Sequence, residues 1–172
     1  GSSAVFTAGR FYDHAAAAAR ALRRRAVLLT GIEDRNPVAG VPDLAVVTSA
    51  DPVVRVPYAP HSEVMPPACA VVHQGGIGTT AQALRAGRPT LVVPFSHDQP
   101  DNAMRVVRLG VGRTLPRSRV SAAAFVRELA ALLADPAVVG RAREVAERVR
   151  HEPGAEGAAD AIERLLATRR AR

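Results

Sequence analysis

The sequence predicts an α/β protein built on a doubly wound parallel sheet, with extra helices at its carboxyl end. Two observations lead to this fold class. Short apolar runs alternate with helical patterns after Pro60, which is typical of parallel β-α-β units. Glycine-rich or polar turns follow these runs, and such sheets bind their ligands outside the carboxyl ends of the strands. Residues 1–172 have the size of one domain and are expected to form a single unit.

The first part of the chain is predicted to contain one helix and three strands. The alanine-rich stretch from about Tyr12 to Arg25 has high helix propensity, with arginines in its last turn. Strands are expected at residues 26–30, 44–47 and 53–56, where short apolar runs end at Gly, Pro or Asp. Because the chain opens with a loop and a helix, we expect that a strand just upstream is missing.

The second part of the chain is predicted to alternate strands and helices. The strands are expected at residues 69–73, 90–93 and 112–115. The helices are expected at residues 79–86, at 101–109, after a start at Ser121, at 136–151 and at 154–167.

Composition excludes several classes of function. The net charge of +7 is carried by arginine alone, in scattered groups without aromatic stacking platforms, so no nucleic-acid partner is expected. The longest apolar runs fall far below the ~20 residues that a membrane span needs, so no span is expected. The single Cys69 excludes an internal disulfide, so a reducing, cytoplasmic compartment is expected. The apolar neighbours of Cys69 predict that its side chain is buried.

The strongest candidate site is the turn after the strand at residues 69–73, which we call the glycine turn (residues 73–80). Glycines let the backbone approach a ligand closely, and the free amides of a helix amino terminus bind diphosphate. His73 is placed to hydrogen-bond a phosphate and, if cationic, to offset its charge. A purely structural strand-to-helix turn is the alternative. The turn reads His73-Gln74-Gly75-Gly76-Ile77-Gly78-Thr79-Thr80, with hydroxyls at its end that either cap the helix or donate to phosphate.

A second polar loop follows the next strand, and we call it the aspartate loop (residues 94–99). It is expected to open onto the same crevice as the glycine turn, because parallel strands end at one edge of a sheet. The carboxylate of Asp98 and the amide of Gln99 are suited to sugar hydroxyls. The alternative is that Asp98 or Asp101 merely caps the following helix.

A third element, at residues 56–61, lies upstream of both loops. Tyr58 is placed to stack on a pyrimidine base, with polar contacts from the backbone near His61, although a tyrosine that packs a turn is an equally good interpretation. No closely spaced metal-ligand set, P-loop lysine or nucleophile elbow occurs, so neither a metal nor a resident cofactor is expected, and no residue of this chain is expected to be catalytic.

Together, these motifs resemble the carboxyl-terminal domain of GT-B-fold glycosyltransferases of the UDP-glucuronosyltransferase-like family, which includes antibiotic glycosyltransferases and bacterial rhamnosyltransferases. The resemblance covers nearly the whole chain and implies a Rossmann-like carboxyl-terminal half of a GT-B fold. It is carried by Gly1-Ser2-Ser3, Tyr58-Ala59-Pro60-His61, the glycine turn, Ala86-Gly87-Arg88-Pro89 and Pro94 to Ala103.

The resemblance implies a donor site for a UDP- or dTDP-sugar. It implies that His73 and the amides through Thr79 hold the diphosphate, and that Asp98 and Gln99 hold the sugar. It also implies that Tyr58 stands where plant relatives stack a tryptophan on the base. Ser2 is implied to approach the phosphates. Plant relatives also place a ribose-binding glutamate where this chain has Ala81, next to Gln82.

The resemblance also implies an inverting glycosyltransferase whose catalytic base and acceptor pocket lie in an amino-terminal domain outside this chain. The acceptor is expected to be a small molecule or a lipid, and this chain alone is expected to bind donor without turnover. Two alternatives remain open: a non-catalytic module that binds nucleotide sugars, and a sugar-nucleotide epimerase.

Overall fold

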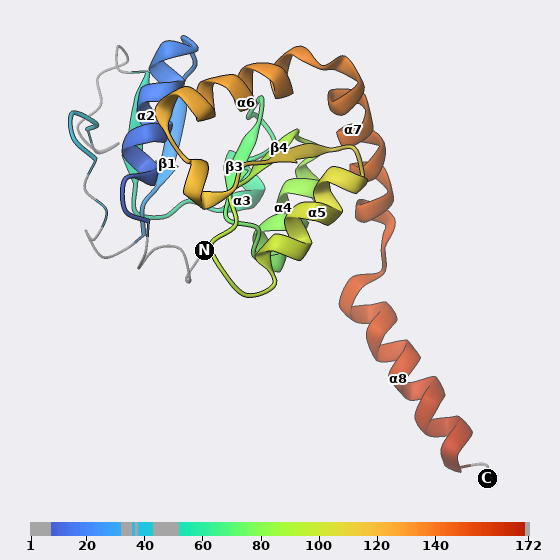
Figure 1. Cartoon of the computed structure of the whole chain (residues 1–172). Helices are drawn as coiled ribbons and strands as arrows, with labels where there is room; N and C mark the ends of the chain where they lie inside the picture. Colours follow the sequence, from blue (N-terminus) through green and yellow to red (C-terminus); the bar gives the residue numbers. More distant parts are fainter. Residues whose placement is uncertain (1–7, 32–35, 37, 43–51, 171–172) are drawn as a thin grey trace.

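The computed structural model describes residues 8–31, 36, 38–42 and 52–170 of the chain (Figure 1). The strand predicted at residues 44–47 and the predicted site residue Ser2 lie outside the described residues. The elements are, in chain order, α2 (Phe11–Ala21), β1 (Ala26–Leu29), β2 (Val53–Val56), α3 (His61–Val64), β3 (Val71–His73), α4 (Ile77–Ala86), β4 (Thr90–Val92), α5 (Gln99–Arg108), β5 (Gly112–Thr114), the 3-10 turn η2 (Arg117–Arg119), α6 (Ala122–Ala134), α7 (Pro136–His151) and α8 (Gly154–Arg170).

All described strand pairs are parallel, as the sequence predicts, but they form two sheets. One sheet has the order β1-β2 and the other the order β3-β4-β5. In the second sheet, Val71 to His73 pair with Thr90 to Val92 without a stagger. The loops that follow β3 and β4 therefore leave the sheet at the same edge.

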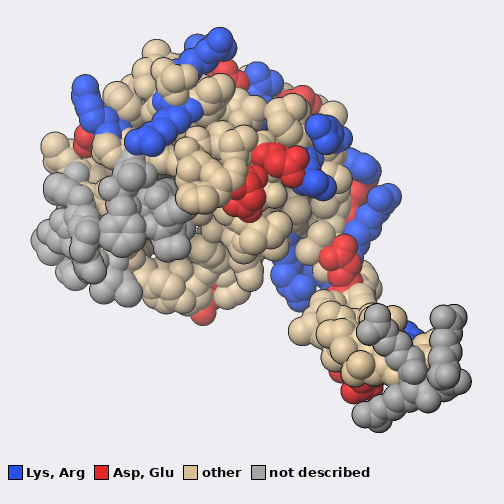
Figure 2. Space-filling model, turned by 60° about the horizontal axis from the view of Figure 1, so that its bottom comes forward, with Lys and Arg blue, Asp and Glu red and all other residues tan. Residues whose placement is uncertain are grey.

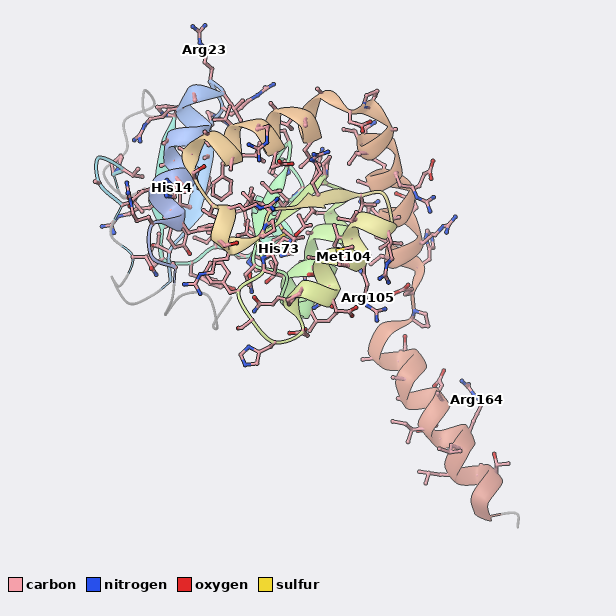
Figure 3. All side chains as sticks on the ribbon, in the orientation of Figure 1. His14, Arg23, His73, Met104, Arg105 and Arg164 are labelled. Carbon is pink, nitrogen blue, oxygen red and sulfur yellow. The ribbon has the colours of Figure 1, made fainter. Side chains whose placement is uncertain are left out.

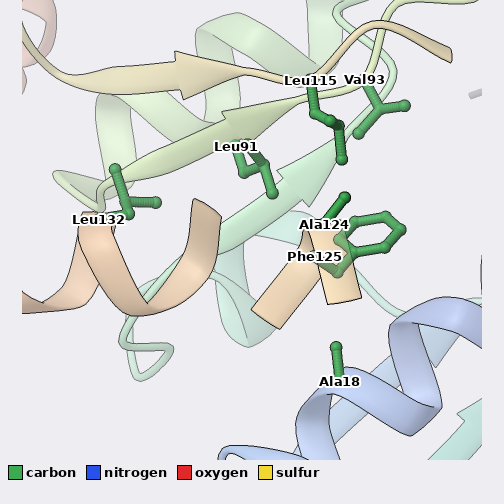
Figure 4. Packing of buried hydrophobic residues seen from close by; sticks show 7 residues of the cluster. All are labelled: Ala18, Leu91, Val93, Leu115, Ala124, Phe125 and Leu132. Carbon is green, nitrogen blue, oxygen red and sulfur yellow. The ribbon is translucent and has the colours of Figure 1, made fainter. Parts of the chain in front are cut away.

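Helices cover both faces of the three-stranded sheet. Leu91 lies in β4, and Val93 directly follows the strand. Both pack into a fully buried cluster with α6 and α2 (Figure 4). Val92, whose side chain points the opposite way, packs against α5 and α7 instead. This alternation along one strand is the mark of a sheet buried on both faces, and it confirms the doubly wound α/β class.

The helix boundaries follow local chemistry. The Ser121 hydroxyl accepts a hydrogen bond from Ala124 N at 3.1 Å and starts α6, as predicted. α5 begins two residues before the predicted start because Pro100 fits the first turn of a helix. α2 ends at Ala21, four residues earlier than predicted, since Arg23 takes a left-handed φ of 52° and turns the chain toward β1.

Two further predictions concern Cys69 and the last helix. Cys69 is exposed, so the prediction of a buried thiol is wrong; it lies just before β3, outside the apolar strand itself. α8 confirms the helix predicted at residues 154–167 and extends away from the rest of the described chain (Figure 1). Its apolar residues Ile162, Leu165 and Leu166 are exposed.

On the face shown in Figure 2, basic residues lie in several separate groups, with acidic residues near some of them. Some arginines form exposed ion pairs, such as Arg105 with Asp101 at 2.7 Å. None of the helices described has both the length and the apolar character to cross a bilayer.

Candidate functional site

The glycine turn and the aspartate loop lie next to each other at the carboxyl edge of β3 and β4. The register pairs His73 with Val92, and Val93 N donates to His73 O at 2.8 Å. His73 lies in the middle of the body, at the end of β3 (Figure 3). The prediction that both loops open onto one edge of the sheet is therefore confirmed.

His73 is buried and uncharged near neutral pH. Its Nδ1 accepts a hydrogen bond from Gly75 N at 2.9 Å, which leaves the ring proton on Nε2. Burial lowers the pKa of the imidazole to about 4. A cationic His73 is one expectation from the sequence; in this structure the ring is neutral because the desolvated site disfavours charge, and it accepts the hydrogen bond from Gly75.

The Nε2 atom of His73 is shielded from solvent and has no hydrogen-bond partner among the described residues. A buried donor without an acceptor costs roughly 1–3 kcal/mol, so such atoms call for an explanation. A ligand oxygen that reached this atom would supply the missing acceptor.

The low pKa of His73 predicts a loss of stability in mild acid. The unfolded chain takes up a proton near pH 6.5, whereas the folded imidazole resists protonation down to about pH 4. The free energy of unfolding should therefore fall as the pH drops from 6.5 toward 4, by up to about 3 kcal/mol from this group. Urea denaturation at pH 7 and at pH 4.5 measures the fall. A His73→Gln variant should show a smaller fall; an equal fall in both proteins would contradict the assignment.

Gly75 shapes the glycine turn through its backbone and its hydrogen bond to His73. Its amide is the donor to His73, and its backbone has a φ of +92°. A Cβ there would lie 2.8 Å from Val92 Cγ1 and 3.1 Å from Gln99 O. Gly75 thus has a conformational role, since only glycine fits this approach, and the contact of its amide with phosphate stays a prediction.

The start of α4 presents the free amides of the turn. The first intrahelical bond runs from Thr80 N to Gly76 O at 2.9 Å, so the amides of Gly76, Ile77, Gly78 and Thr79 have no acceptor within the helix. The Thr80 hydroxyl is buried and also donates to Gly76 O, so it is committed to the backbone of its own helix. Ile77 and Gly78 are exposed, Thr79 is half-buried, and a Cβ on Gly78 would meet open space.

The aspartate loop is held by Gln99. This side chain is 2% exposed, and its Oε1 accepts hydrogen bonds from Phe95 N at 2.8 Å and Ser96 N at 3.1 Å. Its oxygen is therefore committed to the loop, and the predicted contact between Gln99 and a sugar stays a prediction. His97 takes a left-handed φ of 58°, a strained conformation that proteins tend to keep at functional sites.

Asp98 is exposed at the end of this loop. It occupies the residue before α5 but makes no side-chain capping bond, and Asp101 pairs with Arg105 instead. The capping alternative is therefore not what the structure shows. The Asp98 carboxylate accepts a hydrogen bond from Asn102 Nδ2 at 2.8 Å.

Asn102 joins the two loops, and sequence reasoning did not single it out. Its Nδ2 donates to Gly75 O, 27 residues away in the chain, as well as to Asp98. A signal for it exists in the sequence: the buried face of α5 comprises Gln99, Asn102, Ala103 and Val106, which follow helical spacing. A polar residue on such a face must find polar partners.

The third predicted element lies beside the glycine turn. α3, which His61 opens, packs against α4, and the charge of His61 acts on His73. Burial lowers the pKa of the His61 imidazole. Tyr58 is 72% exposed after β2, so its ring does not pack a turn and is accessible for stacking. Ala81 and Gln82 are exposed on α4.

A hollow of about 670 Å³ lies apart from these loops, between the end of α5 and the start of α7. Its lining includes Arg108, Gly110, Val138 and Arg141, and none of the predicted site residues. Arg141 donates to Leu109 O and pairs with Glu144 there. The described residues contain no cluster of three or more His, Cys, Asp or Glu side chains that would hold a metal.

Comparisons with known proteins place the chain in a family. The family model for the erythromycin biosynthesis protein CIII-like carboxyl-terminal domain matches residues 34–165. The O-mycaminosyltylonolide 6-deoxyallosyltransferase of Streptomyces fradiae is 39% identical over 158 residues, which cover 91% of this chain and 34% of that protein. The chain thus spans about a third of the length of this relative.

Two solved structures have the same fold. The glycotransferase of kitacinnamycin superposes with a TM-score of 0.74 at 29% identity, over 90% of this chain and 38% of that one. The glycosyltransferase VinC, solved in complex with dTDP, superposes with a TM-score of 0.63 at 25% identity, over 69% of this chain and 30% of that one. The match to the family model covers most of the chain, and the chain therefore belongs to the family of erythromycin biosynthesis protein CIII-like carboxyl-terminal domains.

Proposed function

We propose that this chain is the donor-binding domain of an inverting glycosyltransferase that transfers a sugar from a UDP- or dTDP-sugar to a hydroxyl of a small molecule or lipid. The observation that carries this proposal is the junction of the glycine turn with the aspartate loop, where Asn102 links Gly75 O to Asp98. Family membership and the dTDP bound to the related VinC support it. The named relative from Streptomyces fradiae is a transferase, which favours transfer over the epimerase and module alternatives.

The diphosphate would lie at the start of α4. The amides of Gly76 to Thr79, which have no intrahelical acceptor, and the positive end of the helix dipole favour an anion there. The Nε2–H of His73 would supply one further donor. These groups need no metal and no resident cofactor to stabilise a departing diphosphate.

The rest of the donor would extend toward the two flanking elements. Asp98, exposed beside the turn, would accept hydroxyl protons from the sugar, with Gln99 holding the loop around it. Tyr58 would stack on the base near His61, and Ser2 would approach the phosphates. An acceptor hydroxyl, deprotonated by a base in an amino-terminal domain, would attack the anomeric carbon in line with the leaving diphosphate. The proposed compartment is the cytoplasm.

We further propose that the sheet contains one more strand than the described residues form. Doubly wound sheets commonly have the strand order 3-2-1-4-5-6. The two observed orders, β2-β1 and β3-β4-β5, reproduce this pattern when strand 1 is removed from between β1 and β3. A further parallel strand between β1 and β3 would join the two sheets into one.

Calorimetric titration with UDP and dTDP tests the donor site. The wild-type chain should bind one of them saturably, and His73→Ala should weaken that binding by about 1–3 kcal/mol because a donor to a charged group is lost. His151, exposed at the end of α7, offers a matched histidine control, and His151→Ala should bind as the wild type does. A folded wild-type chain that binds neither nucleotide would contradict the proposed function; unchanged affinity in His73→Ala would assign His73 a structural role only.

A further inference from the structure

Asn102 occupies the contact between the two halves of the proposed donor site. It is 8% exposed in the second turn of α5, and its Nδ2 lies 2.8 Å from Gly75 O and 2.8 Å from Asp98 Oδ2. An amide nitrogen carries two hydrogens, so each partner receives one. The opposite orientation of the amide would set an oxygen against two acceptors, so these partners determine which way the side chain points.

The backbone around Asn102 brings the partners together closely. Asn102 N donates to Asp98 O at 3.0 Å, which ties Asn102 to the aspartate loop through the first turn of α5. On the other side, a Cβ on Gly75 would lie 3.1 Å from Gln99 O, so the glycine turn packs directly on that same helical turn. Asn102 therefore links two segments that come from different strands.

We infer that Asn102 is a positioning residue that sets the Asp98 carboxylate relative to the glycine turn, and so relates the sugar end of the donor to its diphosphate end. This inference rests on the proposed function. Asp98 is exposed, and a bond to Asn102 restricts the rotamers that its side chain would otherwise sample. Because the same nitrogen is held by Gly75 O, a displacement of the glycine turn is passed to the carboxylate.

The residue type is specific to this task. A serine hydroxyl has a single hydrogen and would serve one partner only. An ionised aspartate has no hydrogen to donate. Its negative charge would be repelled by the Asp98 carboxylate and by the partial negative charge of the Gly75 carbonyl oxygen. Of the side chains of this size, an asparagine alone offers two donors from one atom.

Titration calorimetry of the whole chain tests the inference. The ligands are UDP, dTDP, UDP-glucose and dTDP-glucose. The quantity compared is a ratio: the affinity for the tighter-binding sugar nucleotide divided by the affinity for its bare nucleotide. In Asn102→Ala this ratio should fall by about tenfold while the affinity for bare nucleotide changes by less than about threefold, because a hydrogen bond to a charged group is lost on the sugar side. Asp101→Asn, which removes an exposed ion pair from the same helix, should leave the ratio unchanged.

Two further variants separate positioning from a general structural effect. In Asn102→Asp the ratio should be lowest at neutral pH and should recover as the pH falls toward 5.5, since the two facing carboxyl groups then share a proton and one of them again donates. The wild type should show no such recovery. In an Asp98→Ala background, Asn102→Ala should no longer change the ratio, because the partner that it positions is gone. Thermal unfolding of each variant establishes that it is folded.

The outcomes are distinct. If the wild type binds no nucleotide at all, the proposed function fails and this inference fails with it. Two outcomes leave the proposed function standing and overturn the positioning role. In the first, the wild type binds bare nucleotide but neither sugar nucleotide. In the second, Asn102→Ala weakens the binding of bare nucleotides and sugar nucleotides equally. A persistent effect of Asn102→Ala in the Asp98→Ala background would overturn the positioning role as well.

Discussion

Replacing Gly75 by alanine should destabilise the domain and abolish nucleotide binding. At a φ of +92° an alanine is strained, and its Cβ would overlap Val92 Cγ1 at 2.8 Å and crowd Gln99 O at 3.1 Å. Left-handed strain of roughly 1–2 kcal/mol together with this overlap should lower the free energy of unfolding by about 2–4 kcal/mol. Since the backbone oxygen of Gln99 has little room to move, the turn itself should shift away from α5. Urea denaturation and titration with UDP or dTDP measure the two effects.

Gly78→Ala is the matched control for this prediction. Gly78 lies in the first turn of α4, and a Cβ there meets nothing within 4 Å. Its unfolding free energy should stay the same or rise by up to about 1 kcal/mol, because alanine favours a helix over glycine. Equal destabilisation by both substitutions would show that the close approach at Gly75 does not matter.

Replacing Phe125 by alanine should cause the largest loss of stability. Phe125 is fully buried in α6, and its ring meets Phe11 edge-on at 5.4 Å within the cluster that includes Leu91 and Leu115 (Figure 4). Truncation of a buried phenylalanine leaves a cavity and costs about 3–5 kcal/mol. Native domains are stable by only about 5–15 kcal/mol, so much of the margin would be lost. The midpoint of urea denaturation measures the change.

The same cluster reaches the aspartate loop. Phe11 also packs against Phe95 at 6.1 Å, and the Arg117 guanidinium lies 4.7 Å above the Phe95 ring.

Met104, half-exposed on α5, is the apolar control for Phe125→Ala, and Met104→Ala should change stability by less than about 0.5 kcal/mol (Figure 3). A loss in Phe125→Ala no larger than in the control would contradict the central place of this ring in the core.

The sequence by itself determined the order of most described strands and helices, but not the short α3. It also determined the parallel class of the sheet and the edge at which the two loops meet. Apolar runs, glycines and capping residues such as Ser121 act within a few residues of themselves, so their effect is readable locally. Parallel strands end at one edge, so the neighbourhood of residues 73–80 and 94–99 followed from topology alone.

Only the tertiary structure decided which polar groups of the site are committed and which are free. The Gly75 amide bonds His73, the Gln99 oxygen bonds its own loop, and Asn102 bridges partners 27 residues apart. The neutral state of His73 likewise depends on burial that no local pattern reports. A side chain's partners and its desolvation are set by segments distant in the chain, and local periodicity carries no information about them.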